Sequence, residues 1–153
     1  MADAGGRRDE VATEEAAYAG RDPRRTGLAF AVVFAGGFLG SILREAATPV
    51  LPGALPGFPP WLPTLLINVA ACFLIGVIYG QRTRVHHTLV HFAAIGFCGG
   101  LSTFSHFVQD VDAAWRNGGP AAALIPVLGS VALGIAAATL GEALARQGTR
   151  GRG

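Results

Sequence analysis

Formal charge is absent from four long stretches of the chain, residues 26–43, 46–81, 85–109 and 117–141. All 12 basic and 10 acidic residues of the 153-residue chain lie outside these stretches. A soluble helix or strand needs polar residues on its outer face every turn or two, so this segregation excludes an ordinary soluble globule. Each stretch reaches the roughly 18 apolar residues that cross a hydrocarbon core as a helix. We therefore expect an all-α, polytopic protein of the cell membrane, surrounded by the lipid bilayer.

The chain is expected to form one membrane domain, residues 26–145, with a tail at each end. Residues 1–25 mix acids with arginines and contain no apolar run, which predicts a disordered cytoplasmic tail. Residues 146–153 form a short basic tail. Prolines and glycines interrupt the connection at 49–60. The four expected transmembrane helices are about 26–43, 61–80, 88–108 and 121–140.

Arginine is distributed unequally between the two sides that four spans define. One side carries eight arginines near the membrane and the other carries two. The eight are Arg21, Arg24, Arg25, Arg82, Arg84, Arg146, Arg150 and Arg152, and the two are Arg44 and Arg116. Positive residues favour the cytoplasmic side, so both termini are predicted to be cytoplasmic. The small net charge of +2 gives no support to nucleic-acid binding.

The third span carries an unusual polar run. Two adjacent glycines are followed by four polar residues within five positions: Gly99, Gly100, then Ser102, Thr103, Ser105 and His106. Glycine disfavours a continuous helix, and a helix broken at membrane depth is tolerated where it is buried in protein or lines a wet cavity. We expect such a break at mid-membrane. The alternative is close packing through Gly96 and Gly100, with hydroxyls bonded to their own helix.

Other polar or aromatic residues in the spans have two interpretations each. Asn68 either makes an interhelical hydrogen bond or donates its amide to an anion. Phe104 and Phe107 share a helix face, where they either pack or turn their positive ring edges toward an anion. Arg44 either marks the membrane edge or gives positive potential to an anion entrance. Ser130, in the fourth span, is either a site residue or a hydroxyl bonded to its own helix.

Three segments together carry a family resemblance: Gly36–Arg44 (GGFLGSILR), Pro63–Val69 (PTLLINV) and Gly96–Phe107 (GFCGGLSTFSHF). Over about residues 28–145 the chain resembles the Fluc (CrcB-type) fluoride channels. The resemblance implies passive fluoride efflux, which lowers cytoplasmic fluoride and protects against its toxicity. It implies no enzymatic activity.

The resemblance also implies an assembly and a set of site residues. The assembly is an antiparallel dimer of four-span subunits with two narrow pores. A structural sodium ion that is not transported would be bound by the backbone carbonyls of Gly99 and Ser102. The residues expected to line the fluoride path are Asn68, Thr103, Phe104, Ser105, His106, Phe107 and Ser130. Arg44 matches the arginine that closes the first motif.

Two features depart from the family pattern. His106 stands where a hydroxyl residue is usual, and imidazole titrates near neutral pH, which predicts a mild pH dependence of flux. The strong arginine bias favours insertion in one orientation, whereas an antiparallel homodimer needs both. The second subunit is therefore either the same chain or a paralogue of opposite orientation.

Two other functions fit a four-span protein of this size. A proton-coupled exporter of the small multidrug resistance type needs a carboxylate within a span, but Glu45 and Glu142 lie at the span ends. A non-transporting membrane scaffold would explain the glycines but not the polar break beside paired phenylalanines. The fluoride channel explains both features.

Overall fold

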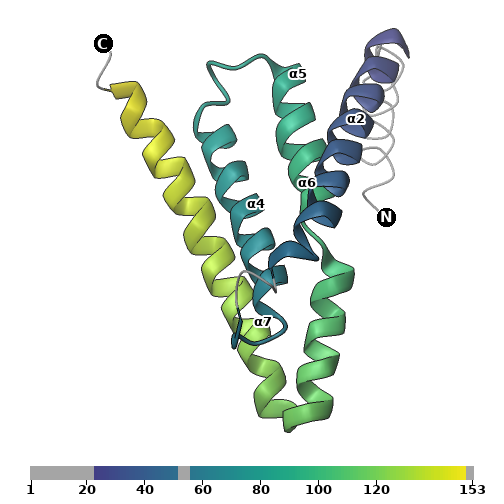
Figure 1. Ribbon diagram of the computed structural model, residues 1–153. Helices are drawn as coiled ribbons and strands as arrows, with labels where there is room; N and C mark the ends of the chain where they lie inside the picture. Colours follow the sequence, from purple (N-terminus) through teal and green to yellow (C-terminus); the bar gives the residue numbers. More distant parts are fainter. Residues whose placement is uncertain (1–22, 52–55, 151–153) are drawn as a thin grey trace, which may run out of the picture. The chain divides into compact units, whose positions relative to one another are not determined.

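The described elements of regular structure are all helical. The computed structural model describes residues 23–51 and 56–150. In chain order the helices are α2 (Pro23–Ala47), α4 (Leu62–Gly80), α5 (His87–Val90), the π-helix η1 (His91–Phe97), α6 (Cys98–Leu101) and α7 (Phe104–Arg150) (Figure 1). The predicted tail at 1–25 lies outside the described residues as far as residue 22, and so do residues 151–153 of the basic tail. Within the described part, the all-α prediction is confirmed.

The chain divides into two compact units, Met1–Ala31 and Val32–Gly153. The described part of the first unit is the beginning of α2. The second unit contains the rest of α2 and all later helices. Every contact, pocket and site described below lies within this second unit.

Three described helical segments are long and apolar enough to cross a membrane: Arg24–Ala47, Leu62–Gly80 and the 61-residue segment His87–Gln147. Large apolar side chains on these segments are exposed, as for Phe34 at 76% and Phe104 at 78%. A soluble protein rarely exposes so much apolar surface. The chain is thus a multi-pass membrane protein.

The long segment is interrupted twice. The first interruption is at Ser102, whose backbone is extended (φ −71°, ψ 153°), as expected for a broken third span. The second is at Gly119, where φ is 74° and ψ is −171°. A side chain would be strained at this positive φ, so glycine suits the position. The chain reverses direction there, which divides α7 into a first arm, 104–118, and a second arm, 120–150 (Figure 1).

Both arms extend beyond the predicted spans, which were bounded by the charge-free stretches. The first arm passes the predicted end near 108 because Asp112 forms an ion pair with Arg116 one turn later, 2.9 Å apart. The second arm passes 140 in the same way, with Glu142 paired to Arg146. Such pairs four residues apart stabilise an exposed helix end. The charge-free stretches therefore mark the apolar part of each helix and not its full length.

Glycines on α2 bring it into backbone contact with η1 and α6. A Cβ added to Gly40 would lie 2.8 Å from the backbone nitrogen of Leu101 and would overlap the carbonyl oxygen of Phe97. A Cβ on Gly100 would overlap the backbone of Gly37 in the same way. Small residues let membrane helices approach closely and gain dispersion energy. This contact holds α2 against the half of the broken span that precedes Ser102.

The second arm of α7 packs closely on α4. A Cβ on Gly76 would overlap the carbonyl of Ala138, and a Cβ on Gly141 would lie 3.1 Å from the backbone nitrogen of Val77. Between α4 and α6 lies a small apolar core formed by Ile67, Ala71, Cys98 and Leu101. Ala71 and Cys98 are completely buried. α4 therefore connects the break on one side with the second arm on the other.

Candidate functional site

The break in the third span consists of Ser102 and Thr103, between the end of α6 and the beginning of α7. The backbone N–H of Ser102 still donates to the carbonyl of Cys98, at 3.0 Å. The helical pattern of backbone hydrogen bonds ends with this bond, so the last carbonyls of α6 need other partners. Thr103 is buried, with an exposed fraction of 8%. Polar backbone at this depth must be satisfied by protein groups or line a wet cavity.

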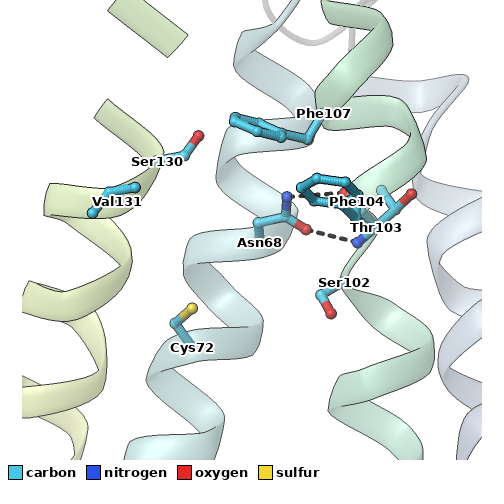
Figure 2. Close-up of a pocket in the computed structure, with 8 residues that line it drawn as sticks. All are labelled: Asn68, Cys72, Ser102, Thr103, Phe104, Phe107, Ser130 and Val131. Carbon is cyan, nitrogen blue, oxygen red and sulfur yellow. Dashed lines mark hydrogen bonds between the residues drawn. The ribbon is translucent and has the colours of Figure 1, made fainter. Parts of the chain in front are cut away.

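Asn68 of α4 makes two hydrogen bonds to the backbone of Thr103. Its Oδ1 accepts from the Thr103 N–H at 2.9 Å, and its Nδ2 donates to the Thr103 carbonyl at 3.3 Å (Figure 2). In a continuous helix that N–H would donate to the carbonyl of Gly99. Asn68 therefore replaces a helical hydrogen bond and holds the break open. Of the two interpretations of Asn68, the structure shows the interhelical hydrogen bond. The amide nitrogen still has a second hydrogen that it can donate to another acceptor.

Thr103 also ends the break on its other side. Its Oγ1 accepts a hydrogen bond from the backbone N–H of His106, at 3.3 Å. This is the arrangement of a helix N-cap, in which a side-chain oxygen satisfies a free N–H of the first turn. The Thr103 hydroxyl thus has a structural partner, while its proton remains available for donation.

Arg44 and Ser41 of α2 both bind the end of α6. Arg44 Nη1 donates to the carbonyl of Gly100 at 3.2 Å, and Ser41 Oγ donates to the same oxygen at 3.4 Å. Arg44 also pairs with Glu45, 3.1 Å away, and only 20% of its side chain is exposed. A cation at a helix C-terminus is favoured by the helix dipole. Arg44 therefore stabilises the end of the broken helix.

A central pocket of about 310 Å³ lies beside the break. Its lining comes from α4, the break and both arms of α7. The lining residues are Asn68, Cys72, Ser102, Thr103, Phe104, Phe107, Ser130 and Val131. In Figure 2, Ser130 faces the pocket across from Asn68 and Phe107. The lining therefore combines neutral hydrogen-bonding groups with aromatic rings and carries no formal charge.

The two phenylalanines lie side by side on the first arm. Their ring centroids are 5.9 Å apart and the ring planes are tilted by 37°. Phe104 is 78% exposed, whereas Phe107 is partly buried. The described part of the chain therefore leaves most of the Phe104 ring uncovered.

The structure brings together most of the predicted site residues. Asn68, Thr103, Phe104, Phe107 and Ser130 all line the central pocket. Ser105 and His106 are not in its lining. Ser105 is exposed and His106 is half-buried. Both belong to other faces of the first arm than the two phenylalanines, because residues one and two positions apart on a helix point in different directions.

The sequence analysis missed Cys72 and Val131 as lining residues. Cys72 is four residues after Asn68 and so lies on the same face of α4. This spacing could have predicted Cys72 as a lining residue. Val131 follows Ser130 directly and contributes apolar surface. Their inclusion makes the pocket more apolar than the predicted set of donors.

Backbone oxygens are the available ligands for a cation at the break. The described residues contain no group of three or more His, Cys, Asp or Glu that could hold a metal ion. The N–H that would occupy the Gly99 carbonyl is bound to Asn68, and a Cβ on Gly99 would meet nothing within 4 Å. Hard cations prefer oxygen ligands. Backbone carbonyls such as those of Gly99 and Ser102 are the kind of ligand that would suit a sodium ion.

The chain is similar to known proteins over most of its length. The family described as "CrcB-like protein, Camphor Resistance (CrcB)" matches residues 31–142. A protein of Ruegeria pomeroyi named fluoride-specific ion channel FluC is 49% identical over 117 residues, which cover 76% of this chain and 90% of that protein. Proteins with the same name from Paracoccus denitrificans and Pyrococcus furiosus are 40% and 38% identical. They cover 76% of this chain in both cases, and 94% and 95% of their own lengths.

Proposed function

This chain belongs to the CrcB family, which is the Fluc type predicted from its motifs, and from that premise we propose that it forms a fluoride-selective channel. The observation that carries the proposal is the uncharged central pocket, in which amide and hydroxyl groups meet the two phenylalanine rings. Relatives named as fluoride channels support the choice of ion. Passive efflux through this path would lower cytoplasmic fluoride and protect the cell from its toxicity.

The chemistry of fluoride explains why neutral groups suit the path. A selective pore must replace the ion's tightly held water with close donors and exclude larger halides by its width. The Asn68 amide and the Ser130 hydroxyl are such donors, and aromatic ring edges carry partial positive charge. A fixed arginine would bind the anion too tightly for release. The uncharged lining of this pocket therefore favours passage of the anion over its tight binding.

We propose four membrane crossings with both termini in the cytoplasm. The 61 residues from His87 to Gln147 would extend about 90 Å as a helix, roughly three times the hydrocarbon core. The reversal at Gly119 divides this segment into two crossings, which follow those of α2 and α4. The arginine bias then assigns the termini to the cytoplasmic side.

The proposed functional unit is an antiparallel dimer with a structural sodium ion. Its support here is the exposed surface at the break, where Gly99 is open and Phe104 is 78% exposed. A second subunit would cover this surface. The carbonyls of Gly99 and Ser102 would hold the ion, and matching carbonyls of the second subunit would complete its shell. A cation bound there would supply positive charge at the ends of the broken helices, which would stabilise them.

Fluoride efflux from liposomes containing the purified chain tests the proposal. Wild-type protein should release fluoride rapidly and chloride only slowly. Phe104→Ala should lower fluoride efflux by about tenfold, because it removes a ring whose positive edge can face the ion, and a barrier higher by about 1.4 kcal/mol slows passage tenfold. Chloride release as fast as fluoride release would contradict the proposed selectivity. Active channels from this chain alone would establish a homodimer, whereas activity only with an oppositely oriented paralogue would establish a heterodimer.

His106 gives a separate prediction about pH. We propose, from the replacement of the usual hydroxyl residue by His106 alone, that fluoride flux differs mildly between about pH 6 and about pH 8. His106→Thr should remove the difference. Equal fluoride flux in wild type and His106→Thr at both pH values would contradict this role.

A further inference from the structure

A second cavity, the outer pocket, has a volume of about 290 Å³. It lies between the beginning of α4 and the two arms of α7, near their turn. Six of its lining residues carry the argument: Trp61, Asp110, Ala114, Asn117, Ala122 and Ile125. Four of the six are apolar or aromatic, and two are polar. Cavities that bind small organic molecules have this composition, and their volumes begin at about 300 Å³.

Asp110 gives the outer pocket an acceptor that lacks a donor. Its Oδ2 is buried and has no hydrogen-bond partner within the described part of the chain. The three ion pairs found among the described residues all involve other carboxylates. A buried carboxylate is costly unless N–H or O–H groups, or a cation, satisfy it. The pocket is therefore suited to a ligand that brings both positive charge and a donor.

Asn117 offers a second acceptor on the same side of the pocket. It is seven residues, or two turns, after Asp110 and so shares its helix face. Its Nδ2 donates to the carbonyl of Ala113 at 2.8 Å, and a carbonyl can only accept, so this bond fixes which end of the amide is nitrogen. The Oδ1 of Asn117 is left to accept a hydrogen bond from a ligand.

Trp61 supplies an aromatic wall to the same cavity. It is half-buried, directly before α4. The face of an indole ring attracts a cation, and a planar guanidinium group can also stack on it. The small side chains of Ala114 and Ala122, on the two arms of α7, leave room for such a group. The wall thus favours a flat organic cation over a bare metal ion.

We propose that the outer pocket is a binding site for a small alkylguanidinium cation. The guanidinium group donates to Oδ2 of Asp110 and lies against the ring of Trp61. Its several N–H groups form a fixed fork, which also allows donation toward Asn117. The alkyl part contacts the apolar wall at Ile125. The inference goes beyond the proposed function, because the ligand is a cation that binds and is not transported.

Isothermal titration of the purified full-length chain in detergent with ethylguanidinium chloride tests the site. Wild-type protein should bind one cation per chain. Asp110→Asn keeps the shape but removes the charge, and binding should weaken by about tenfold or more. Asp112→Asn is the matched control, because Asp112 is exposed and already paired with Arg116, and it should bind as wild type. Absence of saturable binding to wild type, or equal binding to folded Asp110→Asn, would overturn the proposal.

A comparison of ligands on the wild-type protein tests the same site without a substitution at Asp110. Ethylurea has a similar shape and N–H donors but no charge, and tetramethylammonium has the charge but no donor. Each should bind about tenfold or more weaker than ethylguanidinium. Equal binding of either one would overturn the proposed recognition.

Trp61 can report binding directly, because the chain has only two tryptophans and Trp115 does not line the pocket. In Trp115→Phe, ethylguanidinium should change the fluorescence of Trp61 with the midpoint found by calorimetry. Unchanged fluorescence would place the ligand elsewhere and overturn the proposal. These measurements use no fluoride, so failure of the channel function would leave their result standing. Failure of cation binding would likewise leave the proposed channel untouched.

Discussion

Asn68→Leu should abolish fluoride efflux and also remove the effect of sodium on thermal stability. The side chain makes both hydrogen bonds to the Thr103 backbone, and leucine has a similar volume but can make neither. Each unpaired backbone group would cost about 1–3 kcal/mol in an apolar setting. The Thr103 N–H can avoid this cost by donating to the Gly99 carbonyl, which extends α6 by one residue.

Extension of α6 would change two parts of the site at once. It would rotate Phe104, the next residue, away from the central pocket. It would also occupy the carbonyl of Gly99, which is one of the two proposed sodium ligands. The melting temperature of the wild-type protein should be higher in sodium than in N-methylglucamine, whereas that of Asn68→Leu should be the same in both.

Ser130→Ala is the matched control for this experiment. It removes a hydroxyl from the same pocket but neither of the two hydrogen bonds that hold the break. It should weaken efflux and keep the sodium dependence. If Asn68 acted only as a donor to fluoride, Asn68→Leu would also keep the sodium dependence. The two readouts therefore separate a positioning role of Asn68 from a purely ion-binding one.

The sequence predicted the helices and the location of the break for physical reasons that act locally. Charge is excluded from the apolar part of each span, and paired glycines followed by polar residues disfavour a continuous helix. These effects need no knowledge of neighbouring helices. The extended backbone at Ser102 confirms the expected break. The reversal at Gly119 was also signalled, because Gly118, Gly119 and Pro120 are adjacent in the sequence.

The partners of the polar side chains could not be predicted in this way. Asn68 and Thr103 are 35 residues apart, and Arg44 and Gly100 are 56 apart. Each pairing depends on how the helices pack, so the sequence left both interpretations open for Asn68 and Arg44. Helix spacing did contain the information that Ser105 and His106 differ in face from Phe104 and Phe107. Which face borders the pocket became clear only from the positions of α4 and the second arm.

Gly40→Ala should have the largest effect on folding. The added Cβ would overlap the carbonyl oxygen of Phe97 and lie 2.8 Å from the backbone nitrogen of Leu101. Real Cβ atoms essentially never approach other atoms this closely, and here the obstacles are backbone atoms that no rotamer change can move. α2 would have to separate from α6, which would also withdraw Arg44 and Ser41 from the Gly100 carbonyl. We expect a loss of about 3 kcal/mol or more in the free energy of unfolding.

Gly37→Ala provides the comparison, because it is the same substitution three residues earlier on the same helix. Its nearest described neighbour would be the carbonyl oxygen of Gly96 at 3.7 Å, an ordinary van der Waals distance. In size-exclusion chromatography in detergent, Gly37→Ala should elute as wild type, and Gly40→Ala should be largely aggregated or absent. Similar yields and melting temperatures for the two variants would mean that α2 and α6 are not in backbone contact. The break would then depend on Asn68 alone, and Arg44 would be free to act at an anion entrance instead of binding the end of α6.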